Sequence, residues 1–454
     1  MMRAVTCFAA ASSAAIPVTP VAASGFSAWL ETQPAETAAF VKGAGFKADA
    51  GRVLALPGKS GVTGFIAGKD AKDALWAGAL ASALPEGIYR LEALSSDEHE
   101  SAALAWGLGA YQFTSYKQAK RAPAQLAYAP ARETLAAIEA AYFVRDLVNT
   151  PASDLGPAEI EAAALELAQR HDVKLSAIRG NDLLGAGLNL IHAVGKGSAR
   201  MPRLIDITWG KLNDPKLTLI GKGVVFDTGG LDIKPSSNMI LMKKDMGGAA
   251  HVLGLAHMII AAGLPVRLRV LVPAVENSIS GEAYRPSDII KSHKGLTVEI
   301  GNTDAEGRLI LADALSLADA EEPDLMIDLA TLTGAARSAL GPELPALFTD
   351  DDALANALLA ASKAESDPLW RMPLWAPYAK YLESPVADIN NAGSSSFAGA
   401  ITAALFLKRF VEKAKLWAHL DIYAWSPANG PARSVGGEAQ CLRTLYHVIK
   451  NRYS

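Results

Sequence analysis

The chain has 454 residues, with 43 lysines and arginines, 47 aspartates and glutamates, and a net charge of −4. This length exceeds one ordinary hydrophobic core and predicts two domains of unequal size. The balanced charge, without a run of five like charges, argues against a broad nucleic-acid-binding surface. Because Cys7 and Cys441 stand at opposite ends, we expect neither a disulfide framework nor a thiolate metal site.

The first 24 residues are rich in alanine and resemble a weak signal peptide. However, Pro17 and Pro20 interrupt them and only Arg3 precedes the apolar run. The sequence contains no 18 uninterrupted apolar residues of the kind that span a membrane. We therefore expect a cytoplasmic protein without membrane association, and leave open whether residues 1–24 are processed.

The N-terminal third alternates short apolar runs with alanine-rich helical patterns, which predicts a small α/β domain over residues 1–128. The apolar runs are 53–56 and 64–67, and the helical patterns are 70–84 and 101–111. A connecting helix is expected within 129–150, from Arg132 to Val148, because Glu133 falls in its first turn and Pro151 follows its end.

Residues 151–454 are predicted to form the larger, catalytic domain. Its strands are continuous apolar runs, as in parallel sheets covered by helices on both faces. We expect strands at 217–226, 266–272, 325–330 and 417–421, and helices at 158–169, 249–262, 309–320 and 400–412. The fold class is therefore α/β, with a mainly parallel central sheet in the larger domain. Ligands of such sheets bind at the carboxyl ends of the strands.

Residues 302–309, NTDAEGRL, carry two carboxylates and a guanidinium at alternate positions. In an extended segment such positions share a face, so we expect Asp304, Glu306 and Arg308 to converge. Two further carboxylates, Asp227 and Asp245, follow a strand end and precede a glycine pair. The nearby glycines fit neither the phosphate-binding loop nor the dinucleotide-binding pattern.

Four carboxylates are more than one zinc ion needs, and they suit a pair of divalent ions that share a bridging carboxylate and a water. In that setting Lys222 is expected to ligate as a neutral amine. Lys234 is expected to stay protonated and to stabilise developing oxyanion charge.

Three segments carry a family resemblance: GKGVVFDTGGLDIKP at 221–235, LMKKDMGGAAH at 241–251, and NTDAEGRL. In this order and spacing they resemble the leucyl aminopeptidase family of dinuclear metallopeptidases. RDLVNTP at 145–151, DLATLTGA at 328–335 and WAHLDI at 417–422 support the resemblance, which spans about residues 145–425. The N-terminal third is compatible with that family's variable domain in length and α/β character.

The resemblance implies roles for individual residues. One metal ion would be held by Asp227, Asp304 and Glu306, and the other by Lys222, Asp227, Asp245 and Glu306. The ions are expected to be manganese or zinc. By the same resemblance, Lys234 polarises the scissile carbonyl and Arg308 holds a bicarbonate that acts as general base.

The resemblance also implies how substrate binds and how subunits assemble. The free α-amine of a peptide would meet the second metal ion and Asp245, so that only unblocked N-termini are cleaved. Met242, Thr331 and Gly334 would line the pocket for the first side chain, leucine or another hydrophobic residue, and Leu332 would contact the substrate backbone. The expected assembly is a homohexamer.

Other polar residues have simpler interpretations. His251 and His257 are six apart on a helix, so they face different ways and are expected to be satisfied without a metal. His419 is expected to be a structural hydrogen-bonding residue, and Ser394–Ser396 a loop that borders the pocket. Ser287 stands where the family commonly has glycine, which makes the local turn uncertain.

Two alternative functions stay open. One is a DNA-binding or regulatory protein acting through the N-terminal domain, although net acidity and the lack of a basic stripe disfavour nucleic acid as a partner. The other is a different dinuclear hydrolase, such as a phosphoesterase. Such sites usually recruit several histidines, and His251, at the end of its segment, is the one histidine in the three key segments.

Overall fold

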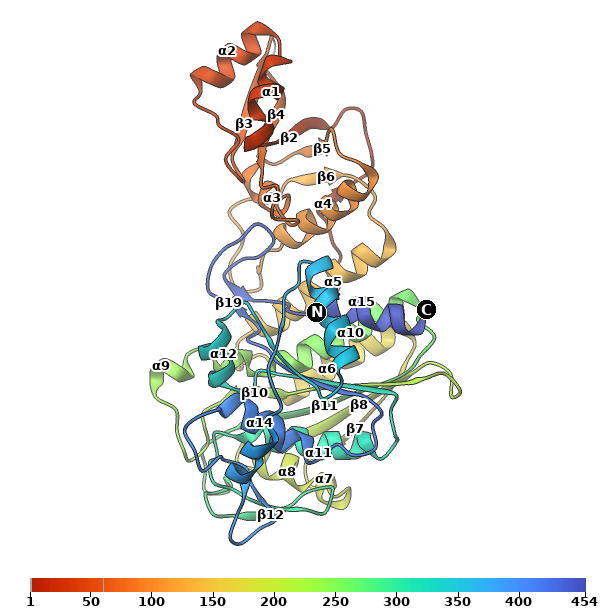
Figure 1. The fold of residues 1–454 in the computed structure, drawn as a ribbon, viewed down its shortest axis with the longest axis vertical. Coiled ribbons are helices and arrows are strands. Elements are labelled where there is room, and N and C mark those ends of the chain that lie inside the picture. The colour runs from red at the N-terminus through yellow and green to blue at the C-terminus, as the bar shows by residue number, and fades with distance from the viewer. Residues whose placement is uncertain (1, 60) are drawn as a thin grey trace. The chain divides into compact units, whose positions relative to one another are not determined.

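The computed structural model describes residues 2–59 and 61–454 and separates them into two compact units. The smaller unit contains Arg3–Tyr142 and Ser426–Val435, and the larger contains Met2, Phe143–Trp425 and Gly436–Ser454. Helix α5 (Arg132–Asn149), the predicted connector, contains the boundary between the units. Both units mix helices and strands (Figure 1). The predicted fold class is confirmed.

The smaller unit is built on a six-stranded sheet of order β1-β6-β5-β2-β4-β3, in which only β3 runs antiparallel to its neighbour. The strands are β1 (Phe8–Ala9), β2 (Ile16–Ala22), β3 (Val53–Gly58), β4 (Gly61–Lys69), β5 (Ile88–Leu91) and β6 (Gln125–Ala127). The helices are α1 (Phe26–Glu31), α2 (Ala35–Gly43), α3 (Gly78–Ala83) and α4 (Ser96–Gly109). The segment that resembles a signal peptide thus contains a central strand, whose Val18 is fully buried.

The helix predicted over 70–84 is mostly wrong, since only α3 is helical there. Before it, Asp70 Oδ1 accepts a hydrogen bond from the Lys72 amide, and Asp73 Oδ1 accepts one from the Leu75 amide. Aspartate side chains that bond the backbone two residues ahead form turns that compete with helix. The alanine-rich composition of this segment favours a helix, whereas its two aspartates form turns.

The larger unit is built on a nine-stranded sheet of order β16-β15-β18-β14-β9-β11-β8-β7, with β10 pairing β11. Its centre, β18-β14-β9-β11, is parallel. The strands are β7 (Lys174–Arg179), β8 (Arg203–Trp209), β9 (Lys216–Gly221), β10 (Gly223–Asp227), β11 (Arg267–Asn277), β14 (Leu325–Ala330), β15 (Ala346–Phe348), β16 (Trp370–Arg371) and β18 (Trp417–Asp421). Small sheets are formed by β12 (Ile289–Lys291), β13 (Thr297–Glu299) and β17 (Ile389–Asn390), and by β19 (Trp425–Ser426) and β20 (Gly436–Gly437).

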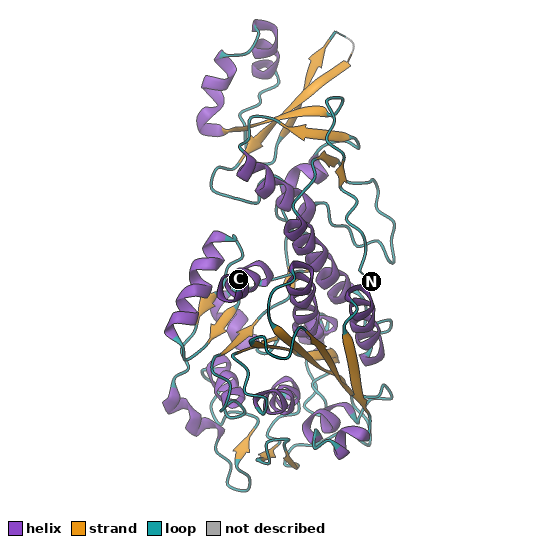
Figure 2. Cartoon of the chain, turned by 90° about the vertical axis from the view of Figure 1, so that its right-hand side faces the viewer, coloured by secondary structure: helices purple, strands orange, loops and turns teal. Residues whose placement is uncertain are grey.

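Helices cover both faces of this sheet (Figures 1 and 2). One layer contains α6 (Pro157–His171), α10 (Gly247–Ala262) and α15 (Leu442–Tyr453). The other contains α8 (Asn189–Gly195), α11 (Glu306–Asp319) and α14 (Gly399–Lys408), which share one core with β9, β11 and β14. The remaining helices are α7 (Asp182–Gly185), α9 (Ser236–Met239), α12 (Gly334–Leu340) and α13 (Asp352–Ala364).

Helix α10 is apolar on all sides because it is packed on all sides. Within the described residues, Met242–Ala262 is the one helical segment long and apolar enough to cross a membrane, but 89% of its apolar window is buried inside the fold. This burial is typical of a core helix.

The strand predicted over 217–226 is interrupted at Lys222. There the backbone amide donates to Leu329 O (3.0 Å), and the carbonyl accepts from the amide of Ala249 (2.8 Å). These bonds end the pairing of β9 and bring the start of α10 close to the sheet. A Cβ on Gly248 would lie 2.0 Å from Leu329 O, so glycine is required there.

The turn at Arg285–Ser287 places a serine in a conformation that favours glycine. Ser287 has φ +70°, a left-handed conformation that favours glycine, while its amide donates to Ile300 O (2.7 Å). The turn therefore stores backbone strain at an exposed serine.

We expect Ser287→Gly to raise the free energy of unfolding by about 0.5–1 kcal/mol, because the relief of left-handed strain exceeds the entropy that glycine adds to the unfolded chain. Urea denaturation measures the change. Ser287→Ala, which keeps a Cβ, should give no such gain. An unchanged or lower midpoint for the glycine variant would contradict the strain.

Candidate metal centre

The candidate centre lies where the carboxyl ends of β10 and β14 meet the starts of α10 and α11. Lys222 is in the break between β9 and β10, and Asp227 ends β10. Asp245 belongs to the short 3-10 helix η2 (Met242–Met246) that precedes α10, and Glu306 is the first residue of α11. All four are at most 3% exposed.

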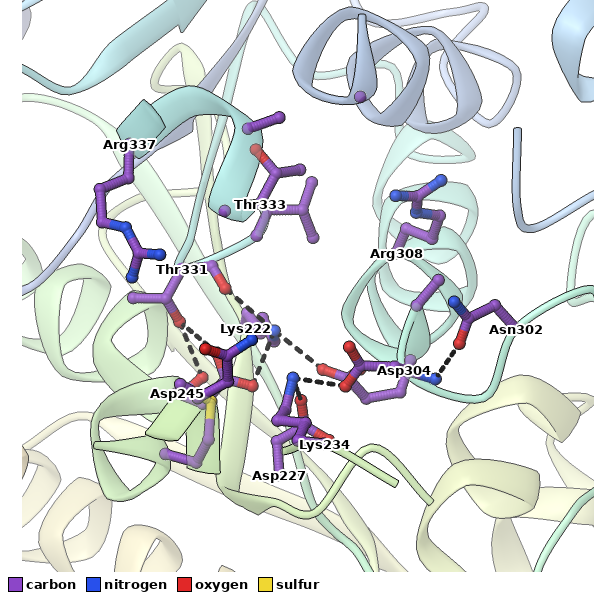
Figure 3. Close-up of a pocket in the computed structure, with 18 of the residues that line it drawn as sticks. Lys222, Asp227, Lys234, Asp245, Asn302, Asp304, Arg308, Thr331, Thr333 and Arg337 are labelled. Atoms are coloured by element: carbon purple, nitrogen blue, oxygen red, sulfur yellow. Dashed lines mark hydrogen bonds and ion pairs between the residues drawn. The ribbon is translucent and has the colours of Figure 1, made fainter. Parts of the chain in front are cut away.

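The extended geometry predicted for the octapeptide is wrong. Residues 302–305 form a turn in which Asn302 Oδ1 accepts the amide of Asp304 (2.7 Å), and α11 begins at Glu306. The helix forms because a buried apolar run follows directly after the turn. Glu306 and Arg308, two apart on a helix, therefore do not share a face. Figure 3 shows Arg308 set apart from the cluster, and its Nη1 donates to Asn391 O (2.7 Å).

Lysines and carboxylates alternate in the cluster (Figure 3). Lys222 Nζ lies 2.8 Å from Asp245 Oδ2 and 2.9 Å from Glu306 Oε1, and also donates to Thr331 O (3.0 Å). Lys234 Nζ lies 2.8 Å from Asp227 Oδ2 and pairs with Asp304 Oδ1. The structure thus brings together all six lysine and carboxylate side chains singled out from the sequence.

The pKa values of the clustered side chains show that burying their charges together is unfavourable. Burial, reinforced by Asp245, raises the pKa of Asp227 to about 6. Burial and the neighbouring Asp227 raise the pKa of Glu306 well above its ordinary value. Burial opposes the charge of Lys222, but Asp245 and Glu306 outweigh it and raise the pKa of that ammonium. The carboxylates therefore hold cations strongly and repel one another.

The donor atoms fit divalent cations. One oxygen each of Asp227, Asp245 and Glu306 lies within 4.8 Å of the others. Asp245 Oδ2, Asp304 Oδ1 and Glu306 Oε1 are buried and accept no hydrogen bond, facing only a lysine ammonium. Hard oxygen donors with unfilled acceptor capacity are the ligands that Mn²⁺, Mg²⁺ and zinc bind.

Several residues that hydrogen-bond to the cluster or to the turn beside it were not predicted from the sequence. Asn277, at the end of β11, donates to Asp227 Oδ1 (2.8 Å) and to Thr303 O (3.1 Å). Tyr284 donates to the same Thr303 carbonyl (2.5 Å), and Asp232 Oδ2 accepts the Thr303 amide (2.8 Å). The position of Asn277 at a strand's carboxyl end was an available signal. The other two depend on tertiary contacts.

A cavity of about 550 Å³ opens over the cluster and is lined by all four residues predicted to contact substrate, Met242, Thr331, Leu332 and Gly334. The loop 331–334 is fixed by Asp421 at the end of β18, whose carboxylate accepts the amides of Leu332 (3.0 Å) and Thr333 (3.2 Å). Ser395, in the loop predicted to border the pocket, also lines it.

The histidines lie outside the cluster. Burial lowers the pKa of His251 to about 4; its Nδ1 faces Gly247 O (2.6 Å) and its Nε2 accepts the Gln440 amide (2.9 Å). His257 contacts His171 (2.8 Å). His419 Nδ1 lies 2.5 Å from Asp328 Oδ1, and both are fully buried.

Comparison with known proteins agrees with this geometry. A family model described as "Cytosol aminopeptidase family, catalytic domain" matches residues 142–446, and one described as "M17 aminopeptidase, N-terminal domain" matches 16–129. The "Probable cytosol aminopeptidase" of Rhizobium meliloti is 45% identical over 77% of this chain and 74% of its own length. That of Roseiflexus castenholzii is 44% identical over 68% of this chain and 64% of its own length.

Solved structures match over nearly the whole chain. Cytosol aminopeptidase from Coxiella burnetii has a TM-score of 0.95 and 46% identity, covering 99% of this chain and all of that one. The bottromycin maturation enzyme BotP in complex with Mn has a TM-score of 0.86 and 35% identity, covering 97% of this chain and all of that one.

An α/β catalytic unit whose parallel sheet ends at a buried set of carboxylates and lysines defines a metallohydrolase. The chain belongs to the cytosol aminopeptidase family, a family of metal-dependent exopeptidases. The resemblance inferred from the sequence motifs is confirmed.

The buried pair of His419 and Asp328 should make stability depend on pH. Burial opposes the charge on His419, but Asp328 outweighs it and raises the histidine pKa above its ordinary 6.5. The pair therefore stabilises fully below pH 6.5 and loses its effect as pH rises through the raised value. We expect Asp328→Asn to cost about 1.5–3 kcal/mol at pH 6 and less at pH 9.

Thermal unfolding at the two pH values measures this difference. Glu365→Gln provides a matched control, because His447 and Glu365 form a similar but partly exposed pair (2.7 Å) that should contribute under about 1 kcal/mol. An equal loss for Asp328→Asn at both pH values would contradict a charged pair.

Proposed function

We propose that this protein is an aminopeptidase that releases the first residue, leucine or another hydrophobic one, from peptides with a free N-terminus. The observation that carries the proposal is the buried cluster of carboxylates and lysines under the cavity, in a chain of this family. Relatives named for the cytosol support a cytoplasmic location, and the resemblance supports a homohexamer.

Two divalent ions are proposed to bind the cluster. Asp227, Asp304 and Glu306 would hold one; Lys222, Asp227, Asp245 and Glu306 would hold the other. The manganese complex of BotP favours manganese over zinc. When bound, the ions would polarise the peptide carbonyl and make a water molecule a nucleophile at neutral pH. Lys222 becomes a neutral ligand only where a cation replaces its proton, because the carboxylates alone keep it protonated.

The chain's own residues supply positioning and charge. Lys234, protonated beside Asp227 and Asp304, would stabilise negative charge that develops on the carbonyl oxygen. Asp245, at the other side of the cluster, would attract the substrate α-ammonium, which selects a free N-terminus.

Arg308 is proposed to hold bicarbonate as the general base. Burial lowers the pKa of its guanidinium to about 10, so it stays charged at neutral pH. Its Nε is buried without a hydrogen-bond partner, which leaves a donor for an anion.

The direct test is release of p-nitroaniline from leucine p-nitroanilide. We expect activity to disappear after exhaustive chelation and to return with Mn²⁺ or Zn²⁺, because the carboxylate cluster binds cations by charge. Calorimetric titration of the stripped protein with Mn²⁺ gives the ion count independently. Full activity after verified metal removal would refute the proposal.

Gly307→Ala tests the position of Lys222. A Cβ at Gly307 would lie 2.5 Å from Lys222 Cε and 2.7 Å from its Nζ, so the methyl group must displace the amine from Asp245 and Glu306. We expect leucine p-nitroanilide hydrolysis to fall at least about tenfold, since a misplacement near 1 Å costs up to a hundredfold.

Helix stability should not explain that loss, because alanine favours an α-helix over glycine by about 1 kcal/mol. Gly185→Ala is a matched control in α7, where a Cβ meets nothing within 4 Å. Unchanged activity in Gly307→Ala would show that the amine position does not matter.

A further inference from the structure

The cavity has a second group of cations that the proposed reaction does not use. Lys244 Nζ lies 4.3 Å from the centre of the Tyr423 ring, and Arg337 Cζ lies 5.4 Å from the same ring. All three residues line the cavity. In Figure 3, Arg337 lies beside Thr331 and Asp245, on the opposite side of the cluster from Arg308.

Within the described part of the chain, Asp245 and Asp421 attract Lys244 only from beyond ion-pair distance. Lys244 is only 5% exposed, yet neither it nor Arg337 forms an ion pair. The nearest carboxylates are already engaged: Asp245 by Thr331 Oγ1 (2.8 Å) and Lys222, and Asp421 by the loop 331–334. A buried ammonium without an ion-pair partner, next to a guanidinium, costs folding free energy.

Cationic side chains outnumber acidic ones over the whole lining of the cavity. Five cationic side chains and four carboxylates line it, and the carboxylates are all in the lysine cluster. Cations bound at the cluster would make the cavity more positive still. An anionic group entering between Lys244 and Arg337 would therefore gain two charge-assisted contacts in a partly desolvated place.

We propose that Lys244 and Arg337 form an acidic-residue subsite, so that this enzyme releases N-terminal glutamate in preference to its neutral isostere glutamine. The assignment rests on the proposed aminopeptidase function. The α-amine of the first residue would lie at Asp245, which is adjacent to Lys244, so the side chain of that residue reaches this end of the cavity. Met242 and Ile422 give the same cavity apolar surface that suits methylene groups.

The test compares kcat/KM for the α-p-nitroanilides of glutamate, glutamine and leucine. We expect a glutamate-to-glutamine ratio of about 10 in the wild type and of about 3 in Arg337→Gln and in Lys244→Gln, since each variant removes one of the two counter-charges. The ratio cancels any general loss of activity. If Lys244→Gln fails to fold because Lys244 is buried, Arg337→Gln alone decides the test, since Arg337 is exposed.

Lys243→Gln is the matched control. It removes the same charge one residue away, but its Nζ donates to Asn149 O (2.6 Å) and Lys243 does not line the cavity. We expect its ratio to equal that of the wild type. Calorimetry with free glutamate and glutamine should give the same order of affinities, independently of turnover.

The outcomes separate the two proposals. Metal-dependent leucine release with a wild-type ratio at or below 1, or a ratio that Arg337→Gln leaves unchanged, overturns the acidic subsite alone. Absence of release from all three substrates in the metal-loaded protein overturns the aminopeptidase function and the subsite with it.

Discussion

One electrostatic constraint organises the catalytic unit: buried carboxylates can lie together only when cations lie between them. Lys222 and Lys234 meet this requirement in the structure, each between two acidic side chains. Burial and, after it, the neighbouring carboxylates still raise the pKa of Asp227 and of Glu306, so the two lysines offset this effect only in part. A cluster in this condition has more affinity for cations than two ammonium groups can satisfy.

The backbone is shaped to bring these charges within reach. Glycine occurs where a Cβ would collide, at Gly248 against Leu329 O and at Gly307 against Lys222. The first contact sets the start of α10, and hence Asp245, against the end of β14. The second brings the start of α11, and hence Glu306, against the amine. The two glycines thus let the starts of α10 and α11 approach the sheet closely, and this close approach sets the distances between the carboxylates.

The sequence predicts the parts of the fold that repeat a local pattern and the spatial grouping of the charged residues that the motifs contain. Leu325–Ala330 forms the predicted strand because a continuous apolar run suits a strand buried on both faces. The octapeptide was assigned the wrong backbone because its alternating charges resemble a strand, while the buried apolar run after it determines a helix. Its grouping with Lys222 and Lys234 was nevertheless predicted, because the motifs fix those residues without regard to backbone.

Residues that act through tertiary contacts could not be predicted in this way. Asn277 and Asp421 come from two different strands, and each orients a partner far away in the chain. Asn277 stands in none of the motifs, and the segment WAHLDI, which contains Asp421, assigns that residue no role, so only the order of the strands in the sheet brings both to the site. Their position at strand ends narrows the search, but strand order requires the long-range pairing itself.

The two groups of cations in the cavity differ in what surrounds them. Lys222 and Lys234 face carboxylates whose free oxygens they alone occupy, so their charge balances the protein's own acids. Lys244 contacts an aromatic ring and forms no ion pair in the described chain; burial lowers its pKa to about 8, although Asp245 and Asp421 oppose this shift. Because a buried charge without an ion pair costs stability, an anion that enters the cavity would stabilise the second arrangement. In the proposed function, the carboxylates of the cavity would bind cations, and Lys244 and Arg337 would bind an anionic side chain.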